Sequence, residues 1–229
     1  MRLLLVLTGS LALAGTASAD LTGMYFAPID NGERDLVTYR ACARFDNPAD
    51  WIGAFAGTEG RPLFFSTNVW SGIYNNDGCF GPGHIDDIPF GTWWTRLDID
   101  TWLTIGRIGG LDGYDFPAFS PDFLGIPGGE DMKVLTDGLT SFSHEDSAVY
   151  YPGPAMPVNT WGDNEVPIDV ALAQFVVEDR DDLLIEFGAV IQWVPEGGEV
   201  TQTYLTAQVP APGALPLLAL AGLLHRRHR

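Results

Sequence analysis

Residues 170–208 read VALAQFVVEDRDDLLIEFGAVIQWVPEGGEVTQTYLTAQ, and this stretch decides the fold class. Val170–Val177 is almost entirely apolar or small, which is typical of a central strand. In Leu183–Trp193 apolar residues recur at every second position, which indicates a long strand packed on a core. A charged turn and a Pro-Glu-Gly-Gly turn separate these segments from each other and from Val200–Gln208. The stretch therefore predicts three consecutive antiparallel strands.

Further strand signals lie upstream. Leu36–Phe45 alternates, with Thr38, Arg40, Cys42 and Arg44 on the face opposite its apolar residues, which is typical of a half-buried strand. Short apolar pieces that suit strands follow at Trp51–Ala56, Pro62–Ser66 and Asp98–Arg107.

No segment carries an apolar stripe at helical spacing, and 27 Gly and 16 Pro interrupt the windows where one could form. We therefore expect an all-β body, an antiparallel β-sandwich of jelly-roll type. Its long Gly- and Pro-rich loops would lie at Thr67–Arg96 and Leu111–Thr160.

The N-terminus has the three parts of a signal peptide. Arg2 supplies the cationic region, Leu3–Ala14 the apolar region, and Ala17-Ser18-Ala19 the small residues that fit a peptidase cleft. The apolar region is too short to span a bilayer in the usual way. We expect cleavage after Ala19, with a retained N-terminal anchor as the alternative, and a single body at residues 20–208.

The body is strongly acidic. Residues 20–208 hold all 30 Asp and Glu against 8 Lys and Arg, a formal charge of −22. Such a surface repels phosphate backbones, so nucleic acid is not an expected partner. The acidity is typical of a solubilising surface, while the many carboxylates leave calcium as a second interpretation.

The body contains two cysteines, Cys42 and Cys79. An exported chain meets an oxidising compartment, where a disulfide between them can persist. The sequence therefore predicts this disulfide, and no clustered Cys and His residues accompany it that would indicate zinc.

The composition changes abruptly after Gln208. Val209-Pro210-Ala211-Pro212 is followed by an uncharged stretch, Gly213–Leu224, and then by a basic end that holds Arg226, Arg227 and Arg229. A dozen helical residues reach about 18 Å, short of the hydrocarbon core of about 30 Å. The arginines would hold the far end in the cytoplasm.

This order resembles the PEP-CTERM sorting signal of exported Gram-negative bacterial proteins, although Ala211 stands where that family usually has Glu. The resemblance covers residues 209–229 and implies processing by an exosortase in hosts that make exopolysaccharide. The resemblance implies where the protein is sent, and it implies no activity. An ordinary C-terminal membrane anchor is the alternative interpretation, because it shares the hydropathy and the basic end.

Common catalytic motifs are absent from the sequence, and we expect no enzyme; a secreted glycoside hydrolase or lyase is the distant alternative. His84-Ile85-Asp86-Asp87 is the nearest approach to a catalytic or metal cluster, and a solvated loop explains it better. Asn75–Gly78 and Asp112–Asp115 resemble fragments of calcium loops, but turn chemistry explains them as well. We therefore assign no metal and no catalytic residues.

Aromatic residues are plentiful, and Trp70, Trp93 and Trp94 fall in an expected loop. Flat rings beside carboxylates and amides are typical of sugar-binding surfaces, although most Trp side chains fill cores. The sequence favours an exported cell-surface or extracellular-matrix protein with a structural or interaction role. A carbohydrate-binding module acting on exopolysaccharide is the second hypothesis. Signal peptidase and an exosortase-like enzyme are the expected partners, with transient or permanent membrane association.

Overall fold

The computed structural model describes residues 21–74, 101–107, 118–119, 138–150, 156–158 and 167–209. All regular elements in this part of the chain are strands. They are β1 (Leu21–Ile29), β2 (Leu36–Phe45), β3 (Trp51–Ala56), β4 (Leu63–Thr67), β5 (Trp102–Arg107), β6 (Ala118–Phe119), β7 (Ser141–His144), β8 (Ala148–Tyr150), β9 (Met156–Pro157), β10 (Ile168–Glu178), β11 (Ile185–Val194) and β12 (Thr201–Val209).

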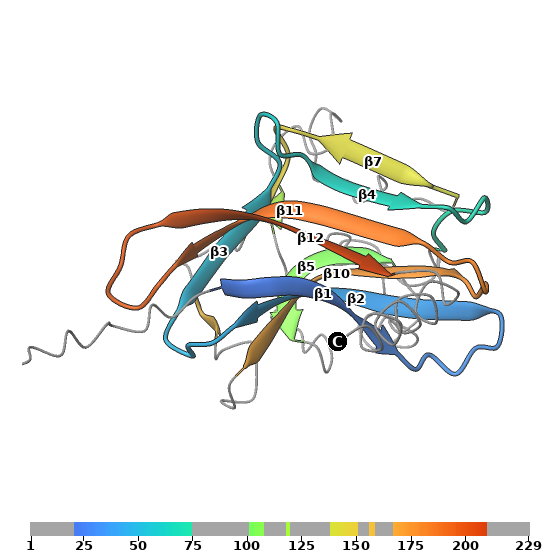
Figure 1. Ribbon diagram of the computed structural model, residues 1–229, viewed down its shortest axis with the longest axis horizontal. Helices are drawn as coiled ribbons and strands as arrows, with labels where there is room; N and C mark the ends of the chain where they lie inside the picture. Colours follow the sequence, from blue (N-terminus) through green and yellow to red (C-terminus); the bar gives the residue numbers. More distant parts are fainter. Residues whose placement is uncertain are drawn as a thin grey trace, which may run out of the picture.

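Two antiparallel sheets pack face to face (Figure 1). The first sheet has the order β1-β2-β10-β5. In the second sheet β11 is central, with β12 on one side and β3 and β4 in line on the other. Beyond β3 and β4 lie β9, β8 and β7, and β6 pairs with β8. The predicted all-β antiparallel sandwich is confirmed.

The chain crosses between the sheets after β2, β4, β5, β9 and β10, so consecutive strands often lie in different layers, as in a jelly roll. The predicted run of three consecutively paired strands is therefore wrong at one step. β10 belongs to the first sheet and β11 to the second, and only β11 and β12 form a hairpin. The loop from Asp179 to Leu184 connects layers instead of neighbouring strands.

Aromatic rings form the centre of the core between the sheets. Phe175 of the first sheet stacks on Phe65 of the second with ring centroids 4.2 Å apart, and its centroid lies 5.5 Å from that of Phe187. All three rings are fully buried. Burial of rings of this size supplies much of the free energy that holds two sheets together.

The second face of β2 and β10 is also inside the protein. Thr38, Arg40, Cys42 and Gln174 point away from the core between the sheets and are nonetheless at most 6% exposed. Arg40 Nε donates to Gln174 Oε1 at 2.8 Å, which gives this buried pair a strong hydrogen bond. The interpretation of 36–45 as a half-buried strand is corrected accordingly, because alternating polarity does not require that the polar face is wet.

The last strand carries the end of the body. β12 pairs with β11 from Thr201 opposite Trp193 to Val209 opposite Ile185, and Val209 packs against the core. The first residue of the predicted sorting motif is therefore part of the ladder. In the part of the chain that the structure describes, no helix has the length and hydropathy needed to cross a membrane, and residues 210–229 lie outside that part.

Candidate functional site

A groove of about 430 Å³ opens at the end of the sandwich where β2 begins and β10 ends. This volume lies in the usual range of small-ligand sites. The loop after β4, the start of β2, the end of β10 and the residue before Leu139 all contribute to it. Its lining residues are Asp35, Leu36, Ser71, Gly72, Ile73, Tyr74, Gly138 and Glu178.

One wall of the groove is a short extension of the first sheet. Ile73 forms an isolated bridge with Val177, and the Tyr74 N–H donates to the Val176 carbonyl at 2.7 Å. The hydroxyl of buried Thr101 completes this wall: it accepts from the Val176 N–H at 3.1 Å and donates to the Tyr74 carbonyl at 2.7 Å. A side chain thus supplies hydrogen bonds that a neighbouring strand would otherwise provide.

A crossing of two glycines fixes the wall of the groove formed by the loop after β4. Gly72 has a φ of +69°, which favours glycine, and a Cβ there would lie 2.3 Å from the carbonyl carbon of Gly138. Around this point the Ile73 N–H donates to the Leu139 carbonyl at 2.9 Å, and the Gly138 N–H donates to the Ile73 carbonyl at 3.0 Å. The backbone at Gly72–Ile73 therefore packs closely against the backbone at Gly138–Leu139, and this contact fixes one wall of the groove.

The groove carries carboxylates and an aromatic ring, and none of the described residues that line it is basic. Ser71 Oγ lies 3.3 Å from Glu178 Oε2 and donates to it, while the Asp179 N–H donates to the Asp35 carbonyl at 2.9 Å. Tyr74 is 36% exposed. Such a lining can accept hydrogen bonds from hydroxyl groups and offer a flat apolar surface, a combination that suits a polyhydroxylated ligand.

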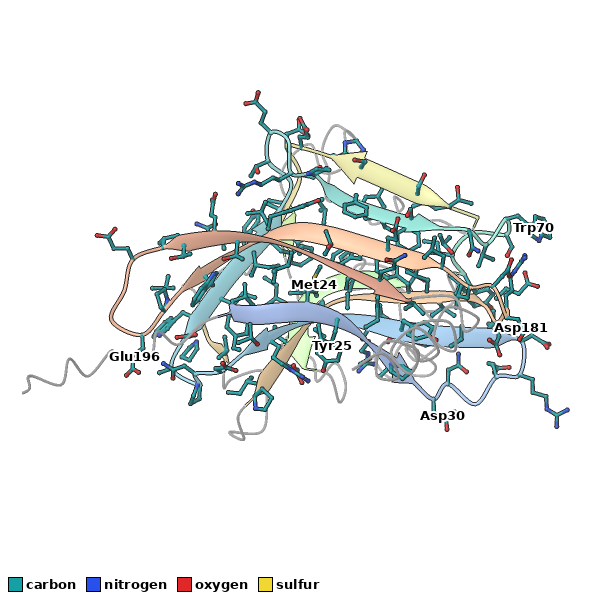
Figure 2. All side chains as sticks on the ribbon, in the orientation of Figure 1. Met24, Tyr25, Asp30, Trp70, Asp181 and Glu196 are labelled. Carbon is teal, nitrogen blue, oxygen red and sulfur yellow. The ribbon has the colours of Figure 1, made fainter. Side chains whose placement is uncertain are left out.

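Trp70 stands directly beside this groove in sequence and is 80% exposed. Figure 2 shows Trp70 at the same end of the molecule as Asp181 and at the opposite end from Glu196. Its loop is clamped to the β10–β11 connection, because the Asn68 amide donates to the Asp182 carbonyl at 2.6 Å and accepts from the Leu184 N–H at 2.8 Å. The Trp70 ring is therefore exposed to solvent on a loop that two hydrogen bonds of Asn68 hold in place.

Of the predicted sugar-binding residues, the structure places only Trp70; Trp93 and Trp94 lie outside the described residues. Sequence reasoning missed Asp35, Tyr74 and Glu178. In the sequence, Glu178 begins a run of charged residues, and no pattern relates it to Tyr74, since the isolated bridge between Ile73 and Val177 brings the two together.

Most residues of the remaining sequence predictions lie outside the described part of the chain. The Cys42 side chain is buried, its Sγ donates to the Arg40 carbonyl at 3.6 Å, and burial raises the pKa of its thiol to about 12. Its predicted partner Cys79 lies outside the described residues, and the disulfide stays a prediction. Three more groups of residues also lie outside them: Pro210, Ala211 and Pro212 of the sorting motif; Arg226, Arg227 and Arg229 of the basic end; and the candidate loops 75–78, 84–87 and 112–115.

Among the described residues, no group of His, Cys, Asp or Glu is arranged to hold a metal ion. The charged turn after β10 is partly neutralised internally, since Arg180 Nε donates to Asp182 Oδ1 at 2.9 Å. This hydrogen bond lowers the pKa of Asp182. Both groups face water, so the pair shapes the turn more than it stabilises the fold.

An ionic cluster of Arg44, Asp169 and Tyr25 lies on the face of the first sheet that points away from the core between the sheets. Arg44 donates from Nε and NH2 to the two oxygens of Asp169 at 2.8 and 2.9 Å, and its guanidinium lies 4.5 Å from the Tyr25 ring centroid. Burial, and then a hydrogen bond to Asp169, raise the pKa of Tyr25 above its usual value. Figure 2 shows Tyr25 and Met24 on opposite sides of β1. The cluster ties β1, β2 and β10 together and holds no unpaired charge that could act as a base.

Comparison with known proteins finds no family model, no curated protein and no solved structure that matches this chain. The geometry above is therefore the basis for any statement about function.

Proposed function

We propose that this chain is an exported protein of the cell surface or extracellular matrix, whose β-sandwich is a non-enzymatic interaction module. Residues 1–19 direct export and residues 209–229 act as a PEP-CTERM-like sorting segment that an exosortase-like enzyme processes. The observation that carries the proposal is the ladder of β12, which is paired with β11 along its whole length and ends at Val209. The apolar segment Gly213–Leu224 begins a few residues after this strand ends, which supports a tail that is separate from the body.

Truncation tests this division. A variant that ends after Val209 should appear in the medium of the native host instead of the envelope, with an unchanged melting temperature. The matched control ends after Tyr204 and removes Leu205, Ala207 and Val209, which pack on the core. This control should melt lower or fail to fold, because it exposes core surface. If the variant ending after Val209 aggregates or loses its cooperative transition, the tail is part of the fold and the proposal fails.

Carbohydrate binding is the second candidate function, and the exposure of Trp70 favours it. An indole that is 80% exposed beside a groove lined by Asp35, Glu178 and Tyr74 offers stacking to a sugar ring and acceptors to its hydroxyls. Exopolysaccharide from the host is the expected ligand.

Affinity electrophoresis tests this candidate. Native gels that contain exopolysaccharide from the host should retard the wild-type body, and Trp70→Ala should reduce the retardation severalfold, in line with the loss of about 1 kcal/mol of ring stacking. Val200→Ala is the matched control, because Val200 is also exposed, at 62%, and lies in the turn before β12, away from the groove. Equal migration with and without the polymer would count against carbohydrate binding.

A further inference from the structure

The outward face of the second sheet carries two adjacent rows of residues without a charge. The register places Tyr150 of β8, Ala54 of β3, Gln192 of β11 and Gln202 of β12 in one straight row across four strands. At about 4.8 Å per strand spacing, this row is about 14 Å long. It carries two exposed amides and a Tyr that is 38% exposed, and it contains no charge.

The next row across the same strands is also uncharged. It consists of Ala148, Ala56, Val190 and Tyr204, in register from β8 to β12, and Val190 is only 2% exposed. Burial raises the pKa of Tyr204, in keeping with a ring that lies partly against the sheet. We call these two rows the uncharged face.

The uncharged face is low in its middle and aromatic on both sides. Ala54 and Ala56 provide little side-chain height on β3, with Tyr150 on the β8 side and Tyr204 on the β12 side. Trp51, at the start of β3 and 41% exposed, extends the aromatic rim. Small side chains on this face thus lie between aromatic ones.

Toward the groove end of the sheet, this face continues over a glycine. The ring of Phe64 lies on Gly188, since a Cβ at Gly188 would be 2.2 Å from Phe64 Cε1. A charge appears on this face at Glu186, and its Oε2 accepts from Ser66 Oγ at 3.1 Å. The uncharged face is therefore bounded by a carboxylate that is already hydrogen-bonded.

The charge of the body decides which occupant fits. A second copy of the chain, or an acidic polymer, would meet a formal charge of −22 and long-range repulsion. A neutral polysaccharide meets no such repulsion, and its apolar ring faces can stack on Tyr150 and Tyr204. The amides of Gln192 and Gln202 both donate and accept hydrogen bonds, as sugar hydroxyls require.

We propose that the uncharged face binds a neutral polysaccharide chain that runs across β8, β3, β11 and β12. The proposal rests on the carbohydrate-binding candidate above and deepens it, since it names the ligand class and makes this face, with the groove beside Trp70 as a lesser contact, the principal surface. The two surfaces are separable by mutation, because Trp70 belongs to the loop after β4 and none of the residues of the uncharged face lines the groove.

The test uses native gels that contain mixed-linkage β-glucan, galactomannan or dextran as neutral probes and alginate as the acidic probe. At least one neutral polymer should retard the wild-type protein, and alginate should not. Tyr150→Ala and Tyr204→Ala should each weaken the retardation about tenfold, and Trp70→Ala should weaken it less. Gln192→Glu and Gln202→Glu, at exposed positions, should also weaken it and keep the wild-type melting temperature, which separates lost binding from lost folding.

Three results would overturn the proposal. If Trp70→Ala alone abolishes the retardation, the groove is the binding site, and carbohydrate binding stands while the uncharged face is wrongly assigned. If no neutral probe retards the protein, the uncharged face is wrongly assigned, and carbohydrate binding at the groove fails as well only if exopolysaccharide from the host does not retard the protein either. If sedimentation shows a wild-type dimer that Gln192→Glu disperses, the occupant of the face is a second copy of the chain.

Discussion

The hydroxyl of Thr101 offers a stringent test of how the groove is built. It is 2% exposed, accepts from the Val176 N–H and donates to the Tyr74 carbonyl. Thr101→Val keeps the shape of the side chain but removes both hydrogen bonds. Each backbone group left unsatisfied in the interior costs about 1–3 kcal/mol. We therefore expect the free energy of unfolding to fall by about 2–5 kcal/mol.

Urea denaturation of the body gives this difference directly, and the melting temperature should fall by about 5–15 °C for a domain of this size. Thr101→Ser is the matched control. It retains the hydroxyl and should recover most of the loss, apart from the contribution of one buried methyl group. Amide exchange adds a local readout, since the Val176 N–H should lose protection in the Val variant and keep it in the Ser variant.

A free energy of unfolding of Thr101→Val within about 0.5 kcal/mol of the wild-type value would refute this role of the hydroxyl. This role would also be refuted if the Ser variant were as unstable as the Val variant, because the methyl group and not the hydroxyl would then carry the effect.

Four further expectations follow from particular contacts. Gly72→Ala should destabilise the body by more than 2 kcal/mol in urea titrations and reduce groove binding, because its Cβ meets backbone and its φ is positive; a wild-type melt would contradict the glycine crossing. In the reduced protein, burial raises the pKa of Cys42 from an unfolded value of 9.0 to about 12, so the free energy of unfolding should decline as the pH rises above 9. Cys42→Ala should flatten that decline. If the variant declines as steeply as the wild type above pH 9, the thiol is not buried. Asp169→Asn should cost more stability than a typical surface ion pair, about 1–2 kcal/mol by calorimetry, since Arg44 loses a bidentate partner; a change below 0.5 kcal/mol would remove the cluster from the account of stability. Incubation with the neutral polymers should release no reducing ends, and turnover that Glu178→Gln abolishes would make the groove a hydrolase site.

The longer strands of the body were largely predictable, because alternation and turn residues are local signals. The short strands β6, β7, β8 and β9 were not, since they lie within Leu111–Thr160, which the sequence predicts as a loop. β2, β3, β4, β10, β11 and β12 lie within a few residues of the expected positions. The partner of each strand is not a local signal. The turn between β10 and β11 is short and charged, as a hairpin turn would be, yet it connects two layers.

β1 was missed for a physical reason. It contains Gly23 and Pro28, which weaken a strand pattern, and Pro28 is tolerated because β1 pairs on one side only, at the edge of its sheet. The buried polar face of β2 was misjudged for a related reason. Arg40 and Gln174 look like solvent-facing residues in sequence and satisfy each other in the interior.

The candidate site was only partly predictable. Trp70 could be found from its place in a turn-rich segment, but the groove depends on Gly72 crossing Gly138, two residues far apart in sequence. The uncharged face needed the register of four strands. Alternation shows which side chains of β11 point outward, and only pairing shows that Gln192 lies beside Gln202 and Ala54.

Mass spectrometry of the mature protein from its native host tests the central claim most directly. The account predicts a chain that begins at Asp20 and has lost the apolar segment and the basic end, recovered from the cell surface or the extracellular matrix. An intact chain from Met1 to Arg229 in the cell interior would contradict export. A chain that begins at Asp20 and keeps Arg229 in the membrane would contradict processing of the tail and leave a simple C-terminal anchor.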